Sequence, residues 1–226
     1  MEEHCRPGSV VLDLGAQPFI VSCALKRMRY EVVAFDVDPE PYLKIAESCD
    51  IKPVKCDLET DELDIGGADC AVFTEVLEHL HYYYVPSILA KINKALKPGG
   101  HLILTTPNIA SLFRRARLLL GIQPLYRYHV REYTMSEVLT MIKDAGFDIV
   151  RAYFSVVNDI SLVDTELPVL NYWGLIKVVV KKPTKLNLLR ALAYPVVKLI
   201  PSLRQLIVVV AVKSRKPEIK AVERWG

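Results

Sequence analysis

The order of apolar and polar positions predicts buried strands alternating with amphipathic helices. Runs of aliphatic and β-branched residues at 10–14, 31–36, 51–56, 68–74 and 101–108 are typical of strands covered on both faces by helices. Between several of these runs, apolar side chains recur at helical spacing, over residues 18–28, 38–48 and 86–96. This alternation predicts an α/β chain built on a mostly parallel sheet.

The second half of the chain predicts a helical lid and the end of the sheet. Residues 109–128 combine an apolar helical face with a basic one, which predicts a lid over a substrate. Thr134 and Glu137 have the spacing of a capping box for a helix that ends at Gly146. Strands are predicted at 147–156 and 206–213.

Between these last two strands the chain is apolar with interleaved lysines and arginines. Prolines and charges interrupt it, so no run reaches the roughly 18 to 20 apolar residues that a membrane span needs. A basic amphipathic segment can still lie on an anionic bilayer without spanning it, and residues 173–204 have this character. Peripheral membrane contact is therefore one alternative for this region.

Composition bounds the architecture. With 226 residues, 51% of them hydrophobic and 24% charged, the chain fits one globular domain over residues 1–226. We divide it into a core at 9–108, a basic lid at 109–133 and a C-terminal half of the sheet with an apolar helical insertion at 134–226. The net charge of +3 is too small to favour a nucleic-acid partner.

The cysteines and the N-terminal residues indicate the cellular compartment in which the protein is expected. The five cysteines are odd in number and form no C-x-x-C pair, a pattern that predicts neither a zinc site nor a disulfide framework. The sequence begins Met-Glu-Glu-His without an apolar signal segment. Both observations favour a reducing, cytoplasmic location.

The first strand and turn point to a nucleotide-containing cofactor. Asp36 ends the second strand about twenty residues beyond the Gly15 turn, where an acidic side chain can bind a ribose diol. A pyrophosphate needs further glycines in the turn, and Gln17 and Phe19 stand there instead, which argues against a nicotinamide-dependent oxidoreductase. A nucleotide-containing cofactor without a pyrophosphate fits this turn better. If that cofactor carries a positively charged sulfonium, the negative charge of Asp13 suits a position near it.

Four segments resemble class I S-adenosylmethionine-dependent methyltransferases. Residues 13–19 resemble motif I, D-x-G-x-G-x-G, with Asp13 and Gly15 kept and the later glycines replaced by Gln17 and Phe19. E-V-L-E-H at 75–79, L-K-P-G-G at 96–100 leading to T-P-N at 106–108, and H-x-R-x-Y-T at 129–134 resemble further family segments. The resemblance implies a Rossmann-like, doubly wound sheet of seven strands, the last antiparallel beside the sixth, with helices on both faces.

The resemblance also implies where S-adenosylmethionine binds. In the family, an acidic residue after the third strand bonds the adenine amino group, and Asp57 matches it; the alternative is an N-cap for a short helix at 60–63. We expect the cofactor to be bound by the following residues: Asp13, Gly15, Ala16, Gln17, Asp36, Val37, Asp57, Leu58, Thr74 and Glu75.

The expected reaction moves a methyl group to an oxygen, or as a lesser alternative a nitrogen, of a small or carrier-linked acceptor. His79 and His129 are candidate bases, with Glu78 beside them. Glu75, Glu78 and the two histidines also look like the set that holds a divalent metal in small-RNA 3′-end methyltransferases, and resemble the related segment of ubiquinone-pathway O-methyltransferases. We favour the metal-free base.

Two further alternatives concern the acceptor and the activity. The basic lid predicts an anionic acceptor, held by Arg114, Arg115, Arg117 and Arg127. The alternative to an enzyme is a non-catalytic cofactor-binding or interaction module with a decayed motif I.

Overall fold

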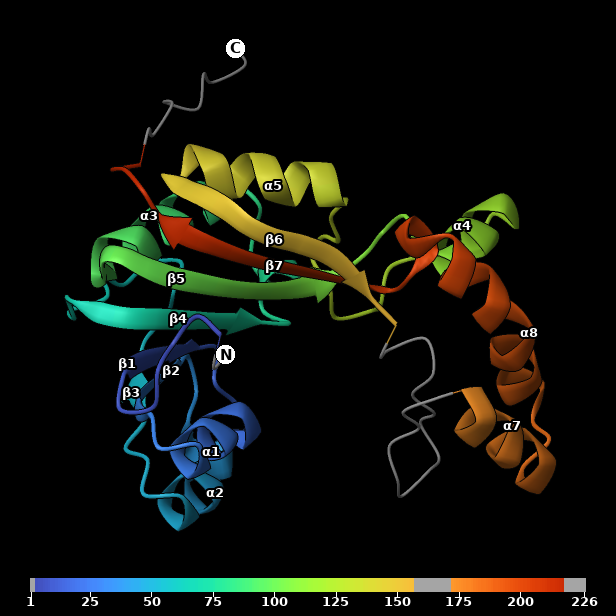
Figure 1. Ribbon diagram of the computed structural model, residues 1–226, viewed down its shortest axis with the longest axis horizontal. Coiled ribbons are helices and arrows are strands. Elements are labelled where there is room, and N and C mark those ends of the chain that lie inside the picture. The colour runs from blue at the N-terminus through green and yellow to red at the C-terminus, as the bar shows by residue number, and fades with distance from the viewer. Residues whose placement is uncertain (1–2, 157–171, 218–226) are drawn as a thin grey trace.

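A mixed seven-stranded sheet forms the centre of the protein. The computed structural model describes residues 3–156 and 172–217. The strand order is β3-β2-β1-β4-β5-β7-β6, and every neighbouring pair is parallel except the two that β7 makes (Figure 1). The strands are β1 (Val10–Leu14), β2 (Glu31–Asp36), β3 (Val54–Lys55), β4 (Ala68–Thr74), β5 (Leu96–Pro107), β6 (Phe147–Ser155) and β7 (Leu206–Lys213). The predicted Rossmann-like sheet with an antiparallel last strand is confirmed.

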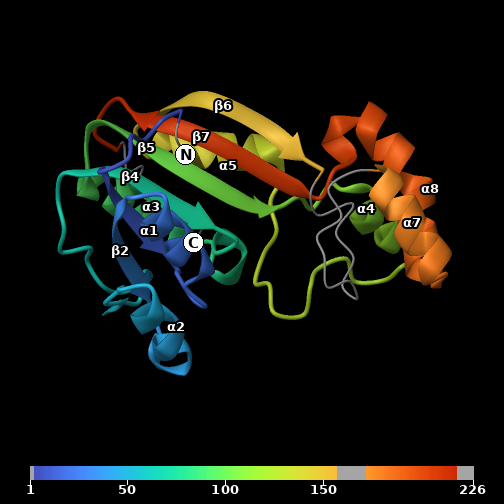
Figure 2. The same cartoon turned by 60° about the horizontal axis from the view of Figure 1, so that its bottom comes forward.

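Helices cover both faces of the sheet. On β4, Ala71 and Phe73 join the core beneath α3 (Val85–Ala95) and α5 (Met135–Asp144). The alternate residues Cys70 and Val72 pack in a separate cluster with Leu25 of α1 (Ile20–Arg27). Beside α1 lies α2 (Leu43–Ser48), preceded by the short η1 (Glu40–Tyr42) (Figure 2). The two-residue period of a strand thus divides its side chains between the two cores.

Local signals account for several boundaries. The Thr134 hydroxyl and the Glu137 carboxylate form the predicted capping box at the start of α5. The predicted helix at 60–63 is absent, because the Asp61 carboxylate accepts the Asp57 N–H and the Asp57 carboxylate accepts the Glu59 N–H, which closes a turn instead. The third strand is correspondingly shorter than predicted.

One boundary was misplaced by the turn residues. We expected Lys97-Pro98-Gly99-Gly100 to end a helix ahead of the fifth strand, but α3 ends at Ala95 and these four residues lie within β5. Leu96 already pairs with Ala68, and a register shift follows before His101 pairs with Cys70. A Pro-Gly-Gly segment is therefore tolerated here at an irregular strand start.

The cysteine prediction was wrong. Cys5 is bonded to Cys70 and Cys23 to Cys49, while Cys56 is a free, buried thiol. The partners are 65 and 26 residues apart, so sequence spacing gave no sign of them. Because disulfides are most common in oxidising compartments, the cysteines no longer support a reducing location.

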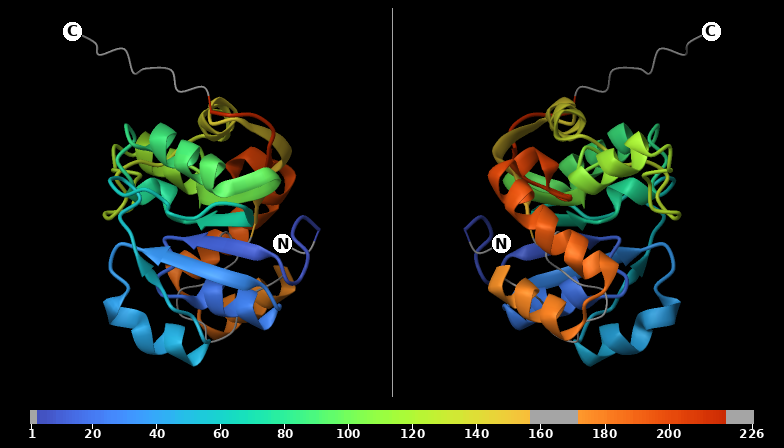
Figure 3. Two further views of the ribbon diagram at one scale, coloured as in Figure 1. Left: turned by 90° about the vertical axis from the view of Figure 1, so that its left-hand side faces the viewer. Right: turned by 90° about the vertical axis from the view of Figure 1, so that its right-hand side faces the viewer.

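Three helices extend beyond the carboxyl ends of β4 and β5. They are α4 (Leu112–Leu119), α7 (Tyr172–Lys181) and α8 (Lys185–Leu199), and we call them the helical lobe. Figures 1 and 2 both show them at this end of the sheet, and α7 and α8 face the viewer in the right-hand view of Figure 3. None of the helices in the described part of the chain is both long and apolar enough to cross a bilayer.

Asn108, the last residue of the T-P-N segment, joins the lobe to the sheet. Its side-chain amide donates to the backbone carbonyls of Ser202 and Arg204, and its carbonyl accepts the Ala110 N–H. Only 1% of Asn108 is exposed. One buried side chain thus ties together the end of β5, the approach to α4 and the segment η3 (Pro201–Leu203) that leads into β7.

We predict that Asn108→Ala lowers the free energy of unfolding by about 2–3 kcal/mol, because it removes three hydrogen bonds of a buried side chain and leaves partly buried backbone groups without those partners. Chemical denaturation measures this loss. The control is Ser48→Ala, which also removes a side-chain hydrogen bond, to the Ile45 carbonyl, but at an exposed site. Equal small losses in the two variants would show that Asn108 is not the junction described here.

Candidate active site

A cleft opens at the carboxyl edge of β1, β2 and β4, where sheets of this type bind ligands. Its volume is about 520 Å³, within the range of small-molecule sites. Seven of the ten residues predicted to bind the cofactor line it: Gly15, Gln17, Asp36, Val37, Asp57, Leu58 and Glu75. His79 also lines the cleft.

Gly15 lets the first turn approach the loop that follows β4. Its φ is +72°, and a Cβ there would lie 2.5 Å from a methyl carbon of Val76. A larger residue would therefore be strained both by its backbone and by its neighbour.

The altered motif I leaves the cleft open. Phe19 has a φ of 66°, a conformation that favours glycine, yet its ring is fully buried with Ala16, Ala34 and Ala46 between α1, α2 and β2. The ring therefore fills the core and does not line the cleft. Gln17 is exposed at the rim, where its amide donates to the Asp38 carbonyl. The two departures from motif I thus give no structural reason to expect a decayed site.

Asp36 ends β2 with its carboxylate at the base of the cleft. The two oxygens accept backbone N–H groups from Gln17 and Asp38, at 2.9 and 3.1 Å. These bonds fix the carboxylate and leave each oxygen further lone pairs for a ligand.

Three of the predicted cofactor residues do not line the cleft. Asp13 is buried and accepts the Ser22 hydroxyl at 2.5 Å, and burial raises the pKa of its carboxyl to about 6. Ala16 packs in the core, and Thr74 lies within β4. The structure therefore places Asp13 behind the turn, bound to α1.

The E-V-L-E-H segment leaves β4 through a strained residue. Glu75 has a φ of 56°, and its carboxylate accepts the Thr105 hydroxyl from β5. The next turn is the 3-10 helix η2 (Leu77–His79), which buries Glu78 against Thr106. Burial, together with the neighbouring Glu75, raises the pKa of Glu78 to about 8, so this side chain is a neutral acid at pH 7.

The imidazole of His79 is held by its Nδ1 atom. Nδ1 lies 3.1 Å from the Tyr128 carbonyl oxygen. A carbonyl only accepts, so Nδ1 carries the proton and the neutral ring presents the Nε2 lone pair. Burial lowers the pKa of His79 below its ordinary value, which keeps the ring neutral at pH 7.

His129 is held in the same way by a buried carboxylate. Its Nδ1 lies 2.8 Å from Glu132, whose side chain is fully buried. Arg114 of α4 binds the same carboxylate with two nitrogens, each at 2.7 Å. Burial alone would raise the pKa of Glu132, but the hydrogen bonds from Arg114 and His129 outweigh it and lower the pKa, so the carboxylate is ionised. Sequence reasoning missed Glu132, although it stands inside the H-x-R-x-Y-T segment.

The two imidazoles meet edge to face, with ring centroids 4.9 Å apart. Glu78 completes the group, because one ligand atom from each of Glu78, His79 and His129 lies within 4.8 Å of the others. Glu75 is outside this group and bonded to Thr105. The structure thus brings together the three predicted catalytic residues, in an arrangement that fits a proton acceptor or a divalent cation.

The four arginines of the lid do not form one anion site. Arg114 is neutralised by Glu132. Arg115 and Arg117 each donate through Nε to backbone carbonyls close in sequence, and Arg127 lies over the ring of Tyr128. The predicted role of Arg114 as a phosphate receptor is therefore not supported.

Comparison with known proteins assigns the family. The model of a methyltransferase domain matches residues 1–152. A ubiquinone biosynthesis O-methyltransferase of Xanthomonas campestris pv. campestris is 34% identical over 112 residues, which cover 45% of this chain and 44% of that protein. The match thus spans less than half the length of the curated relative.

Solved structures share the fold. An S-adenosylmethionine-dependent methyltransferase from Archaeoglobus fulgidus superposes with a TM-score of 0.63 at 17% identity, over 93% of this chain and 89% of that one. The 1,6-didemethyltoxoflavin-N1-methyltransferase of Burkholderia thailandensis, which has S-adenosylhomocysteine bound, gives 0.58 at 18% identity, over 95% and 75%. This chain belongs to the class I S-adenosylmethionine-dependent methyltransferases.

Proposed function

We propose that the protein methylates a hydroxyl oxygen of a small or carrier-linked acceptor, with a histidine as base. The observation that carries this proposal is a pair of contacting imidazoles, of which His79 lines the cofactor cleft, each with its Nδ1 held by a hydrogen bond. The one curated relative described above is named as an O-methyltransferase, which also supports oxygen as the acceptor atom.

The residues of the cleft fit S-adenosylmethionine. Gly15 lines the cleft without a side chain of its own, which suits close approach of the methionine part, and the fixed carboxylate of Asp36 suits the ribose hydroxyls. Asp57 would bind the adenine amino group. When bound, S-adenosylmethionine supplies an electrophilic methyl group on a positively charged sulfur.

The protein's part in the reaction is alignment and proton removal. His79 lines the cleft, so its Nε2 would take the acceptor proton while the Tyr128 carbonyl holds Nδ1–H. His129, held by Glu132, would stand beside His79 and orient the acceptor hydroxyl. Glu78 in its neutral form adds no charge that would hold a proton on His79.

A divalent cation is the second candidate, favoured by the convergence of Glu78, His79 and His129. These three residues would hold Mg²⁺ or Mn²⁺, which would lower the pKa of an acceptor hydroxyl. A cation would displace the proton that burial holds on Glu78, so metal binding would release a proton. We propose the metal-free base because both imidazoles already have Nδ1 held by a hydrogen bond.

The cofactor contacts predict the effect of Asp36→Ala. Two hydrogen bonds to a charged acceptor contribute roughly 1.5–3 kcal/mol each, so affinity for S-adenosylhomocysteine should fall by well over tenfold. Calorimetry measures it. Asp38→Ala removes an exposed carboxylate two residues away and should bind nearly as the parent does; unchanged affinity in a folded Asp36→Ala protein would refute the ribose contact.

The base predicts a distinct response to chelation. Methyl transfer to a panel of phenols should survive EDTA, and His79→Ala should lower kcat by roughly 10²- to 10⁴-fold. Mn²⁺ titration followed by electron paramagnetic resonance supplies a readout that needs no acceptor. Tight Mn²⁺ binding that His79→Ala abolishes, with loss of activity in EDTA, would establish the metal instead; full activity in both His79→Ala and His129→Ala would reject both candidates.

We expect Glu132 to contribute to stability through Arg114 and to catalysis through His129, and variants of these residues separate the two effects. Glu132→Gln leaves the partly buried Arg114 without its counter-charge and should cost about 3–5 kcal/mol of stability. Arg114→Met combined with Glu132→Gln should recover much of that stability, yet kcat should stay low with an unchanged KM for S-adenosylmethionine, because His129 has lost its carboxylate. Recovery of kcat along with stability would reduce Glu132 to a structural role.

A further inference from the structure

The helical lobe exposes apolar side chains on all three of its helices. On α8 they recur at helical spacing along one stripe: Leu188, Leu189, Leu192, Val196 and Leu199. Their exposed fractions include 66% for Leu192 and 82% for Leu199. The opposite side of α8 is the packed one, because Ala191 contacts Leu175 of α7.

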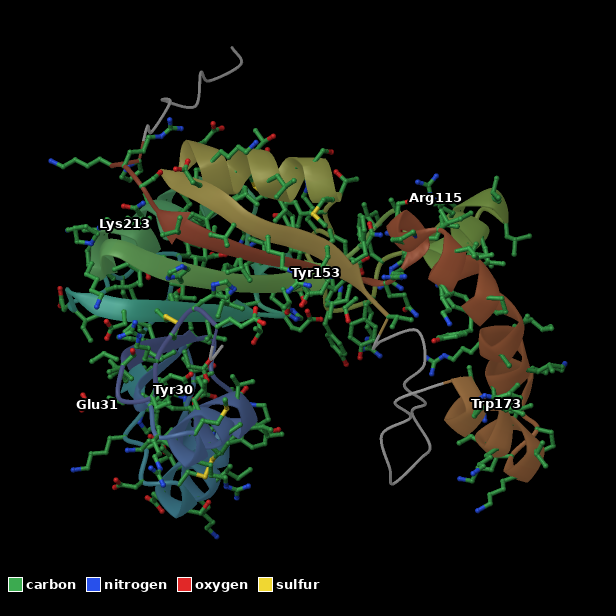
Figure 4. The ribbon with its side chains drawn as sticks, viewed as in Figure 1. Tyr30, Glu31, Arg115, Tyr153, Trp173 and Lys213 are labelled. Atoms are coloured by element: carbon green, nitrogen blue, oxygen red, sulfur yellow. A yellow bond between two sulfur atoms is a disulfide. The ribbon has the colours of Figure 1, made fainter. Side chains whose placement is uncertain are left out.

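The other two helices of the lobe, α7 and α4, also expose large apolar side chains. Trp173 and Val180 of α7 are about three-quarters exposed, and Lys177 and Lys181 lie on the same helical side, four and eight residues beyond Trp173. At the end of α4, Leu119 and the following Leu120 are 87% and 74% exposed. Figure 4 shows Trp173 and Arg115 in the lobe, apart from the side chains of the sheet.

Charge in the lobe has one sign. Residues 109–130 and 172–204 contain eleven Lys and Arg and no Asp or Glu, whereas the rest of the chain has eighteen basic and twenty-six acidic residues. The small net charge of +3 therefore hides a strongly basic lobe, because the other residues that the structure describes include sixteen basic and twenty acidic ones. A surface of exposed leucines bordered by cations matches a bilayer with anionic headgroups, since the apolar side chains enter the acyl boundary and the cations stay at the headgroups.

We propose that the helical lobe docks on an anionic lipid bilayer and that the methyl acceptor is a hydroxyl-bearing molecule that partitions into that bilayer. The second half of this inference rests on the proposed function. The lobe lies beyond the carboxyl ends of β4 and β5, at the same edge as the cofactor cleft. Arg114 of α4 binds the carboxylate that holds His129, so the docked surface is connected to the imidazole that lies beside the proposed base His79.

Vesicle flotation of the full chain tests the docking. We expect it to float with vesicles of equal parts phosphatidylcholine and phosphatidylglycerol, and to stay at the bottom with phosphatidylcholine alone. Lys177→Gln combined with Lys181→Gln should weaken vesicle binding about fivefold for each charge removed, and high salt should weaken it further.

A matched pair of variants separates insertion from non-specific adhesion. Leu192→Glu should weaken vesicle binding about tenfold, while Ile20→Glu, at an equally exposed residue of α1 (66% for both), should leave it unchanged. Circular dichroism checks that both variants are folded. Equal loss in the two variants, or equal flotation on both lipid compositions, would overturn the proposal.

Two further measurements test whether the apolar face binds a second copy of the chain and whether docking and cofactor binding are independent. Light scattering after gel filtration detects self-association; a dimer that Leu192→Glu dissociates, with no flotation, would assign the apolar face to a second copy and overturn the membrane assignment. Calorimetry with S-adenosylhomocysteine on the same samples keeps the two ideas apart. Cofactor binding without flotation refutes the docking and leaves the proposed function standing. Flotation without cofactor binding refutes the proposed function, and with it the acceptor assignment, and leaves the docking standing.

Discussion

A single buried carboxylate connects the catalytic edge of the sheet with the helical lobe. Glu132 accepts two hydrogen bonds from Arg114 and one from His129, and no part of its side chain reaches solvent. A buried charge is tolerated only when it is paired and fully hydrogen-bonded, so these three residues constrain one another. The position of α4 and the orientation of His129 are therefore set by the same interaction, while Asn108 fixes the other end of this junction.

Both histidines are oriented by a hydrogen bond from Nδ1, but the two acceptors differ in charge. His79 donates to a backbone carbonyl, in a setting that favours the neutral ring, whereas His129 donates to an ionised carboxylate. In both arrangements Nε2 is the nitrogen left for another partner, and in His79 that atom lies 4.0 Å from a carboxyl oxygen of Glu78. Methyl transfer from a sulfonium needs little more than alignment and a proton acceptor, so such a pair beside the cofactor cleft would suffice for the proposed reaction.

The sheet was predictable because each strand carries its own signal. Continuous apolar runs marked β1, β2 and β4, the boundaries predicted for β7 match the structure, and the Thr134 capping box located α5. The misplaced boundary came from Pro98-Gly99-Gly100, whose turn chemistry is the same at a helix end and at an irregular strand start. The disulfides and the burial of Phe19 depend on contacts between distant residues, which no local pattern contains.

The candidate site was predictable as a set of residues and not as a network. Asp36, Glu78, His79 and His129 were identified by motif, but the motif spacing does not say that Asp13 turns toward Ser22. It also gives no sign that Arg114 is paired with Glu132, or that Glu132 orients His129. These relations require the third dimension, because each joins side chains from different elements.

In the proposed mechanism, His79 presents Nε2 as a base because its Nδ1 proton is held by the Tyr128 carbonyl. Long-range ¹H–¹⁵N nuclear magnetic resonance on histidine-labelled protein near neutral pH reads this tautomer directly, with His79→Ala to assign the signal. The account predicts a neutral His79 ring protonated at Nδ1. A ring protonated at Nε2, or one that is fully protonated at this pH, would contradict it.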